Sequence, residues 1–358
     1  MSTIKVLHII ARMNVGGTAK YLADLVESIP DSALATGFVQ GSEIEDPVMT
    51  NLASYRITHL GRKIAPLQDF KSWIELSRLV RELKPKIVHT HTFKAGIIGR
   101  LVRGNHKRVH TFHGHLFDDQ TFSNLEKWAI TCAERFLAGR TDILISVGKK
   151  VGMELRVAGI GRNAKWRSIP PGVNKLSKIE KKEARSFLKI NTDEFLVGWM
   201  ARMTGVKNPF LLLEVAQRMP EVKFVMAGGG DLLEKVRTNA PANVSLIGWA
   251  DASIFWSAVN CAISTSDNEG MPIALIEAQL ASLPVIATDV GSSSEVIEDG
   301  ITGFITEREV DSLVIGLRKL VTNDDLLNEM GKSASVTALR KFNPENMISE
   351  HKQIYSEF

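Results

Sequence analysis

The sequence predicts an α/β protein made of two Rossmann-like domains, each built on a parallel sheet. Two observations predict this fold class: a length of 358 residues, and apolar strand-like runs that alternate with amphipathic helical stretches. A single hydrophobic core rarely grows beyond ~250–300 residues, so this length predicts two domains. The alternation of strand and helix patterns is typical of parallel sheets that carry helices on both faces.

Candidate strands occur in both halves of the chain. In the first half they are Lys5–Ile10, Lys86–His89, Arg108–Phe112 and Ile143–Val147. The second half repeats the plan, and a loop and a helical stretch follow each of Leu196–Met200, Lys223–Met226, Val244–Ile247, Cys261–Ser264 and Val285–Ala287.

A proline-rich break separates the two halves. Pro170-Pro171-Gly172 cannot continue a helix and predicts a hinge. The predicted domains are therefore 1–169 and 170–344. The helix-breaking Asn343-Pro344 introduces a last helix, 345–358, which we assign to the first domain.

Composition restricts the class of protein. Hydrophobic residues make up 44% and charged residues 23% of the chain, as in ordinary globular proteins. Cys132 and Cys261 lie far apart and have no metal-ligand spacing, so neither a disulfide framework nor a zinc site is predicted. No apolar stretch reaches the ~20 residues needed to cross a bilayer, and we expect a cytoplasmic protein.

The positive charge is concentrated in the first half. Residues 1–170 contain 25 Lys and Arg against 15 Asp and Glu, whereas residues 171–358 contain 19 against 25. Such a surface attracts acceptor phosphates, an anionic membrane or nucleic acid. The equally good alternative is that these charges only face water and bind no partner. We expect no nucleic-acid binding, because no helix-turn-helix, RNP or zinc-finger pattern accompanies the charge.

Ligands of open α/β sheets bind outside the carboxyl ends of the strands, so the residues that follow each strand are candidates for a site. After the first strand, Gly16-Gly17 precedes a helix that we expect from about Ala19. Consecutive glycines there let backbone N–H groups approach an anion, although a tight turn explains them equally well. The fingerprint Gly-x-Gly-x-x-Gly is absent, which argues against a nicotinamide cofactor.

Histidines gather after the next two strands, at His89, His91, His110, His113 and His115. Because neither loop contains Asp or Glu, we expect no metal site there. We expect His113, held before Gly114, to hydrogen-bond a polar ligand near neutral pH. For the other four histidines we favour packing or hydrogen bonding at the ends of the strands.

Two cations share one predicted strand-to-helix loop. Arg202 and Lys207 follow the strand Leu196–Met200, with Gly205 between them and Pro209 at the start of a helix. Together they can neutralise a diphosphate, because Arg provides a planar fork of donors and Lys a point charge. The alternative is a pair of exposed loop charges.

The segment from Ser266 to Ala278 has the most specific pattern. Pro272 suits the first position of a helix. The free N–H groups at that helix start favour an anion or a sugar hydroxyl, and the residues around it are Gly270, Met271 and Ile273.

Two glutamates belong to this segment. Glu277 interrupts a helix that is otherwise apolar almost all round. A buried carboxylate needs a cation or hydrogen bonds, so Glu277 either binds a ligand or pairs with a buried base. Glu269 lies in the loop before the helix, and we expect it at the mouth of a ligand cleft.

At these residues the sequence resembles the retaining glycosyltransferases of family 4, which have the two-domain GT-B fold with two parallel sheets that face each other across a cleft. The resemblance covers nearly the whole chain. It rests on Gly16-Gly17, His113-Gly114, Pro170-Pro171-Gly172-Val173, Arg202 with Lys207, Glu269 eight residues before Glu277, the run from Pro284 to Gly291, and the run from Gly300 to Phe304. The paired glutamates are its most specific part.

The resemblance implies a role for each of these residues. The first domain would bind the acceptor and the second the nucleotide sugar. Arg202 and Lys207 would bind the donor diphosphate and stabilise the departing nucleotide, so that no metal or other cofactor is expected. Glu277 would hydrogen-bond the ribose, and Glu269 with the amides of Gly270 and Met271 would hold the transferred sugar. His113 would contact that sugar, and Gly16-Gly17 would close on the phosphates and the acceptor.

Two positions depart from the family pattern. The usual Gly-Arg is Ala201-Arg202 here, and Ser292-Ser293-Ser294 replaces a second glycine after Gly291. The two histidine-rich segments resemble bacterial members that build surface polysaccharides on lipid-diphosphate carriers. With the basic first half, this similarity implies a lipid-linked or glycan acceptor and attachment to the inner face of the cell membrane. A uridine diphosphate sugar is implied as donor because it is the commonest donor of the family.

Three other readings remain open at this point. A GT-B sugar-nucleotide epimerase would bind the same donor and transfer nothing. A non-catalytic nucleotide-sugar-binding protein would use the same cleft, although the intact set of Arg202, Lys207, Glu269 and Glu277 argues against it. A nicotinamide dehydrogenase lacks support from the glycine pattern.

Overall fold

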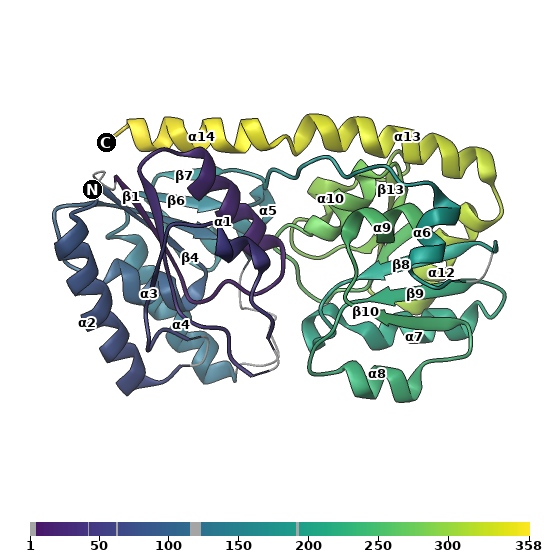
Figure 1. Ribbon diagram of the computed structural model, residues 1–358, viewed down its shortest axis with the longest axis horizontal. Helices are drawn as coiled ribbons and strands as arrows, with labels where there is room; N and C mark the ends of the chain where they lie inside the picture. Colours follow the sequence, from purple (N-terminus) through teal and green to yellow (C-terminus); the bar gives the residue numbers. More distant parts are fainter. Residues whose placement is uncertain (1–4, 42, 62–63, 115–122, 191–192) are drawn as a thin grey trace. The chain divides into compact units, whose positions relative to one another are not determined.

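The computed structural model describes residues 5–41, 43–61, 64–114, 123–190 and 193–358. The chain forms two compact units (Figure 1). The described residues from 5 to 172, together with 344–358, form unit 1, and residues from 173 to 343 form unit 2. His115 lies outside the described residues.

Unit 1 contains a parallel sheet in the order β3-β2-β1-β4-β5-β6-β7. Its central strands are buried along most of their length, as expected for a parallel sheet that is covered on both sides. The strands are β1 (Val6–Ile10), β2 (Ser32–Thr36), β3 (Ser54–Arg56), β4 (Ile87–His91), β5 (Lys107–Phe112), β6 (Ile143–Ser146) and β7 (Trp166–Ser168).

Helices cover both faces of this sheet. Against one face pack α2 (Pro66–Leu83) and α3 (Phe93–Arg100), in a core that includes Leu76 and Ile98. Against the other pack α1 (Gly17–Ser28) and the last helix of the chain, α14 (Pro344–Ser356) (Figure 1). The remaining helical segments are η1 (Pro47–Thr50), α4 (Asn124–Ala138) and α5 (Lys149–Val157).

Unit 2 repeats the architecture around a parallel sheet in the order β10-β9-β8-β11-β12-β13. In chain order its strands are β8 (Leu196–Met200), β9 (Lys223–Ala227), β10 (Val244–Gly248), β11 (Cys261–Ser264), β12 (Val285–Thr288) and β13 (Gly303–Thr306). Its helical segments are α6 (Lys181–Phe187), η2 (Gly205–Lys207), α7 (Pro209–Arg218), α8 (Leu233–Asn239), α9 (Ala252–Ala258), α10 (Ile273–Leu280), α11 (Ser293–Val296), α12 (Val310–Val321) and α13 (Asp324–Lys341).

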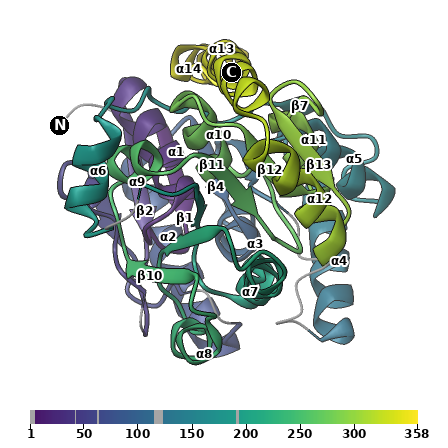
Figure 2. The ribbon, with the colours of Figure 1, turned by 90° about the vertical axis from the view of Figure 1, so that its right-hand side faces the viewer.

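Two separate cores hold the helices of unit 2 to its sheet. One joins α7, α8 and α12 to β8 and β9 through residues such as Leu212, Val236 and Trp199. The other joins α9 and α10 to the opposite face through residues such as Trp256 and Ile276. Figure 2 shows α7 and α8 on one side of this sheet and α9 and α10 on the other.

The predicted fold class is confirmed, and all nine predicted strands are present to within two residues at either end. The sequence analysis missed four strands: β2, β3, β7 and β13. Two of them, β3 and β7, have three residues each and lie at the edges of the unit 1 sheet, so they lack a buried apolar run. Among the described residues, no helix combines the length and the apolar character that crossing a bilayer requires.

Candidate active site

In unit 2, the loops after β8 and β11 bring two predicted site residues into contact. The Nζ atom of Lys207 lies 2.6 Å from the Oε1 atom of Glu269. The hydroxyl of Ser266 donates to the same carboxylate oxygen at 2.7 Å. The Glu269 side chain is 8% exposed and that of Lys207 is 22% exposed, so this charged pair is partly shielded from water. Arg202 lies five positions before Lys207, half-buried in the same loop.

Asn208 fixes the course of the Lys207 loop. Its backbone is left-handed, with φ 43°, and its side-chain oxygen caps α7 by accepting a hydrogen bond from the N–H of Leu211. The amide nitrogen of the same side chain donates to Asp267 at 3.1 Å. The hydroxyl of Thr265 donates to the Asn208 carbonyl at 2.9 Å, and the N–H of Asp267 donates to the carbonyl of Val206 at 2.8 Å. These bonds tie the Lys207 loop to the Glu269 loop.

The helix α10 starts four residues after Glu269. The helix begins at Ile273 with Pro272 as its N-cap, so the predicted place of Pro272 as the first helical residue is wrong by one position. The reason is that the Pro272 backbone is extended, with ψ 94°, while its carbonyl already accepts the first helical hydrogen bonds. Gly270, Met271 and Ile273 are partly exposed around this start. Glu277 is 4% exposed one turn further along.

Glycines shape both loops, and the sequence analysis named Gly291 among them but not Gly228 or Gly230. At Gly228 and Gly230, which follow β9 with positive φ, a Cβ would lie 2.0 Å from the carbonyl oxygen of Ala201 and 2.6 Å from that of Met203. At Gly291 a Cβ would lie 1.7 Å from the carbonyl oxygen of Glu269. Only glycine lets these backbones approach the residues beside Arg202 and Glu269. The triplet Gly228-Gly229-Gly230 after a predicted strand was the available signal.

In unit 1, the predicted Gly16-Gly17 turn opens α1. Gly16 is the N-cap, with φ 151°, and the helix starts at Gly17 instead of the expected Ala19. The Gly16 carbonyl accepts the first backbone bond of the helix, from Ala19. The two glycines are partly exposed, so the N-terminal amides of α1 are open to an anion.

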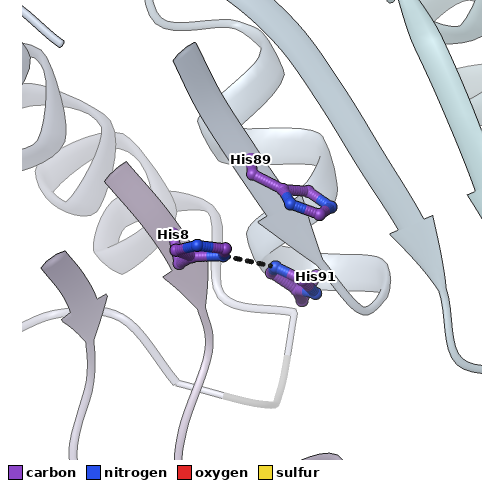
Figure 3. A group of neighbouring side chains, drawn as sticks. All are labelled: His8, His89 and His91. Atoms are coloured by element: carbon purple, nitrogen blue, oxygen red, sulfur yellow. Dashed lines mark hydrogen bonds between the residues drawn. The ribbon is translucent and has the colours of Figure 1, made fainter. Parts of the chain in front are cut away.

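His113 follows β5 and ends a buried layer of polar rings between the unit 1 sheet and the helices α1 and α14. Its Nε2 atom lies 3.1 Å from the Nδ1 atom of His91, and the Nε2 atom of His91 lies 3.1 Å from the Nδ1 atom of His8. His89 pairs with Tyr355 of α14 at 2.6 Å and with Thr111 at 2.7 Å. Figure 3 shows His8, His89 and His91 on adjacent strands, with the bond that joins His8 to His91.

His8, His89 and His91 are the one group of the described residues whose ligand atoms are close enough to hold a metal ion, within 4.8 Å of one another. Hydrogen bonds use most of the ring nitrogens of these three residues, although His8 Nε2 has no partner among the described residues. Both ring nitrogens of His89 have partners, and His8 and His91 bond each other. That the reaction needs no metal stays a prediction from the sequence. Packing and hydrogen bonding of His89, His91 and His110, which we favoured above, agree with their complete burial.

Burial makes this layer sensitive to acid. It lowers the pKa of His8 and of His113 from 6.5 to about 3, and the nearby His351 adds a smaller repulsion in both cases. Burial also lowers the pKa of His351 to about 4, and the hydrogen bond to the Met347 carbonyl opposes the shift. These rings are neutral in the folded protein at pH 5, whereas the unfolded chain binds protons there.

The stability that the neutral rings provide is therefore complete above pH 6.5 and is lost as the pH falls towards 3. Each such histidine removes up to ~1.4 kcal/mol of unfolding free energy per pH unit in this window. We expect a lower urea midpoint at pH 5 than at pH 7.5, and a shallower decline in a His8→Phe variant. Equal midpoints at the two pH values would contradict the assignment of neutral rings.

Two family models match the chain. The one described as glycosyl transferases group 1 matches residues 180–336, and the one described as glycosyl transferase 4-like domain matches residues 16–172. Each model falls on one of the two units, and together they span most of the chain.

Curated and solved proteins agree with these matches. The chain is 26% identical over 381 residues to the UDP-Gal:alpha-D-GlcNAc-diphosphoundecaprenol alpha-1,3-galactosyltransferase of Escherichia coli, over 99% of this chain and 97% of that protein. It is 27% identical to the putative glycosyltransferase EpsD of Bacillus subtilis, over 81% of each chain. Anabaena HepE, solved with UDP and glucose, has the same fold, with a TM-score of 0.85 and 19% identity over 99% of this chain and 100% of that one. The chain belongs to the glycosyltransferases with the GT-B fold, of the family 4 type.

Proposed function

We propose that this chain transfers a sugar from a uridine diphosphate sugar to a lipid-diphosphate-linked or glycan acceptor in the synthesis of a surface polysaccharide, with retention of anomeric configuration and without a metal ion. The observation that carries the proposal is the contact between Lys207 and Glu269 at 2.6 Å, at the carboxyl edge of the unit 2 sheet and in the loop that also contains Arg202. A cation held there can neutralise a phosphate, because ligands of such sheets bind at this edge.

Each site residue has a role in this proposal. Arg202 and Lys207 bind the diphosphate, and the partly exposed amides around Gly270 and Met271 bind the sugar together with Glu269. Ile273 begins the helix that presents these amides, and Glu277 accepts hydrogen bonds from the ribose. In unit 1, His113 binds a sugar hydroxyl, and the N-terminal amides of α1 at Gly16-Gly17 bind phosphate.

The transfer needs no protein nucleophile. The bond between the anomeric carbon and the leaving phosphate oxygen breaks, and the acceptor oxygen bonds to that carbon from the same face. The proton of the acceptor hydroxyl passes to the leaving diphosphate. Arg202 and Lys207 stabilise the negative charge that develops on this group, which is the contribution that a divalent cation makes in other transferases.

Names of relatives support the choice of donor and acceptor. The Escherichia coli relative is named for UDP-galactose and a diphosphoundecaprenol-linked acceptor. Other relatives are named for the biosynthesis of capsular polysaccharide and O-antigen. HepE has been solved in complex with UDP-glucose. A uridine nucleotide and a lipid-linked acceptor are therefore the first substrates to test.

The test is incubation of the protein with a panel of UDP-sugars, with and without undecaprenyl-diphosphate-linked sugars, in the presence of EDTA. The proposal expects release of UDP that requires the acceptor, and an α-linked product from an α-linked donor. An epimerised donor without acceptor would support the epimerase instead. Thermal stabilisation by UDP without turnover on any acceptor would support the binding protein.

We also propose that α2 places unit 1 on an anionic membrane, facing the cytoplasm. Leu67, Phe70 and Ile74 lie three to four positions apart on one face of α2 and are exposed, Leu67 by 80% and Phe70 by 59%. The exposed Lys71 and Arg78 lie on the same face, at the same helical spacing. Exposed apolar side chains beside cations are typical of helices that lie in a membrane interface.

Replacing Leu67 and Phe70 by Glu is expected to lower co-sedimentation with vesicles of phosphatidylcholine and an anionic lipid at least fivefold, because it removes apolar burial and adds repulsion. Phe187→Glu is the matched control, since Phe187 is 60% exposed on unit 2. Binding that is insensitive to salt, to anionic lipid and to the α2 substitutions would reject this part of the proposal.

A further inference from the structure

Three imidazoles of unit 1 are hydrogen-bonded in series. His8 Nδ1 pairs with His91 Nε2 at 3.1 Å, and His91 Nδ1 pairs with His113 Nε2 at 3.1 Å. The series starts in the middle of β1, crosses β4 and ends after β5 at His113. His8 and His91 are completely buried, whereas His113 is partly exposed. The series therefore connects the core of the sheet to the predicted ligand side of unit 1.

All three rings are neutral near pH 7.5. Burial lowers the pKa of His8 and His113 to about 3, and it lowers the pKa of His91 well below 6.5, with further repulsion from His89 and His8. A neutral imidazole has one N–H donor and one acceptor nitrogen. His91 is bonded through both nitrogens, so it must donate on one side and accept on the other, and the proton positions of the three rings depend on one another.

Only two arrangements satisfy both bonds. In the first, each ring is protonated at Nδ1: His8 donates to His91, His91 donates to His113, and the Nδ1–H of His113 is left over. In the second, each ring is protonated at Nε2 and the bonds run in the opposite direction. The arrangements differ at the buried end, where His8 Nε2 has no hydrogen-bond partner among the described residues.

The buried end decides between the two arrangements. In the first, His8 Nε2 is a lone pair without a donor, and in the second it is an N–H without an acceptor. Buried N–H groups without partners are rarer in proteins than buried acceptors without donors. The first arrangement leaves the less costly atom unpaired, and it also directs a donor out of the core at His113.

We propose that His91, supported by His8, is a positioning residue that holds His113 in the Nδ1–H tautomer, so that His113 meets its ligand as a hydrogen-bond donor. The identity of that ligand, a sugar hydroxyl oxygen, rests on the proposed function. The tautomer itself does not. His113 Nε2 is occupied by the bond from His91, so this nitrogen is not available as a base, and Nδ1 carries the proton.

Neighbouring rings hold the orientation that the series needs. The Tyr21 ring meets His113 edge to face, with centroids 4.9 Å apart and planes at 88°. The Tyr21 hydroxyl points instead to His351, whose Nε2 atom lies 3.0 Å away. Since His351 Nδ1 donates to the Met347 carbonyl at 2.8 Å, His351 Nε2 accepts from Tyr21. Tyr21 is thereby engaged elsewhere and does not compete for the nitrogens of His113.

The experiment is long-range ¹H–¹⁵N NMR of the full chain labelled with ¹⁵N-histidine, at pH 7.5 and without ligand. The signals of His113 and His91 are assigned from their loss in His113→Asn and His91→Phe variants. The expected result is that both rings are protonated at Nδ1. An Nε2-protonated His113 in the unaltered protein would overturn the proposal.

His91→Phe tests the coupling, because it keeps an aromatic ring and removes the donor. We expect His113 to become a mixture of tautomers in this variant. His110→Phe is the matched control: His110 is equally buried on the neighbouring strand, its Nδ1 atom pairs with Thr90, and it is outside the series. An unchanged Nδ1–H form in His91→Phe, or the same change in His110→Phe, would overturn the proposal.

Kinetics then separate this inference from the proposed function. If His113 donates to the sugar, His91→Phe raises KM for the UDP-sugar up to about tenfold, the effect of one lost hydrogen bond, and His110→Phe does not. If no UDP-sugar binds or reacts while the NMR result holds, the proposed function fails and the tautomer assignment stands. If transfer proceeds and His113 is protonated at Nε2, the inference fails alone.

Discussion

Replacing Lys207 by Met is expected to lower kcat for sugar transfer by roughly 10²–10³-fold, the loss that follows removal of one preorganised group from a developing negative charge. The Lys207 ammonium lies 2.6 Å from Glu269 on the more exposed side of the pair, where a diphosphate can approach it. Arg202 remains and continues to bind the phosphates. KM for the donor should therefore change less than kcat, since the charge on the leaving group grows during the reaction.

The matched control is Lys223→Met. Lys223 begins β9, its side chain is 40% exposed, and its Nζ atom lies 3.9 Å from the Glu194 carboxylate. We expect this variant to retain full activity. Initial rates of UDP release with saturating acceptor measure both variants. If Lys207→Met keeps kcat within threefold of the unaltered protein, Lys207 has no part in stabilising the leaving group. The metal-free mechanism would then lose its main support.

Gly291→Ala is expected to destabilise unit 2 by about 3–5 kcal/mol, near the upper limit for one substitution. The Gly291 backbone has φ 49°, and a Cβ there would lie 1.7 Å from the carbonyl oxygen of Glu269. Backbone atoms cannot move aside as a side-chain tip can, so the Glu269 loop itself must shift. Activity should therefore fall even at temperatures where the variant remains folded.

Gly300→Ala separates backbone strain from this steric contact. Gly300 has φ 74° in the same unit, but nothing lies within 4 Å of the position of its Cβ. Gly300→Ala should lower the free energy of unfolding by only about 1 kcal/mol, the strain of an alanine in the left-handed conformation. Urea denaturation followed by tryptophan fluorescence, to which the buried Trp199 and Trp256 contribute, compares the two. Equal midpoints for the two variants would show that the approach to Glu269 is not tight.

Strands could be predicted from the sequence where a buried strand consists of consecutive large apolar residues. The strand Leu196–Met200 was predicted at its observed bounds, because it is buried along most of its length. By contrast, β2 has the sequence SALAT, whose small residues give little hydrophobic signal although four of the five are buried. Sheet position, which a single sequence does not reveal, decides the burial of such a strand.

The sequence predicted which residues and loops make up the candidate site. It did not predict the hydrogen bonds between them. Arg202, Lys207 and Glu269 were identified by charge and by their place after strands. The hydroxyl of Ser266 on Glu269 and the Asn208 cap on α7 depend on side-chain directions that only the folded loops fix. The histidine series depends on strand register, because His8 lies opposite His89 when β1 and β4 pair.

The last helix has a consequence for the synthesis of the chain. Met347 and Ile354 of α14 belong to the core of unit 1, and His351 and Tyr355 complete its polar layer, yet all four follow the whole of unit 2 in the sequence. A ribosome adding ~5–20 residues per second takes roughly 10–30 s to translate 173–343. During that interval the nascent first unit exposes the apolar surface that α14 later covers, together with imidazoles that lack hydrogen-bond partners. A chaperone that binds exposed apolar surface would therefore act on the chain at this stage.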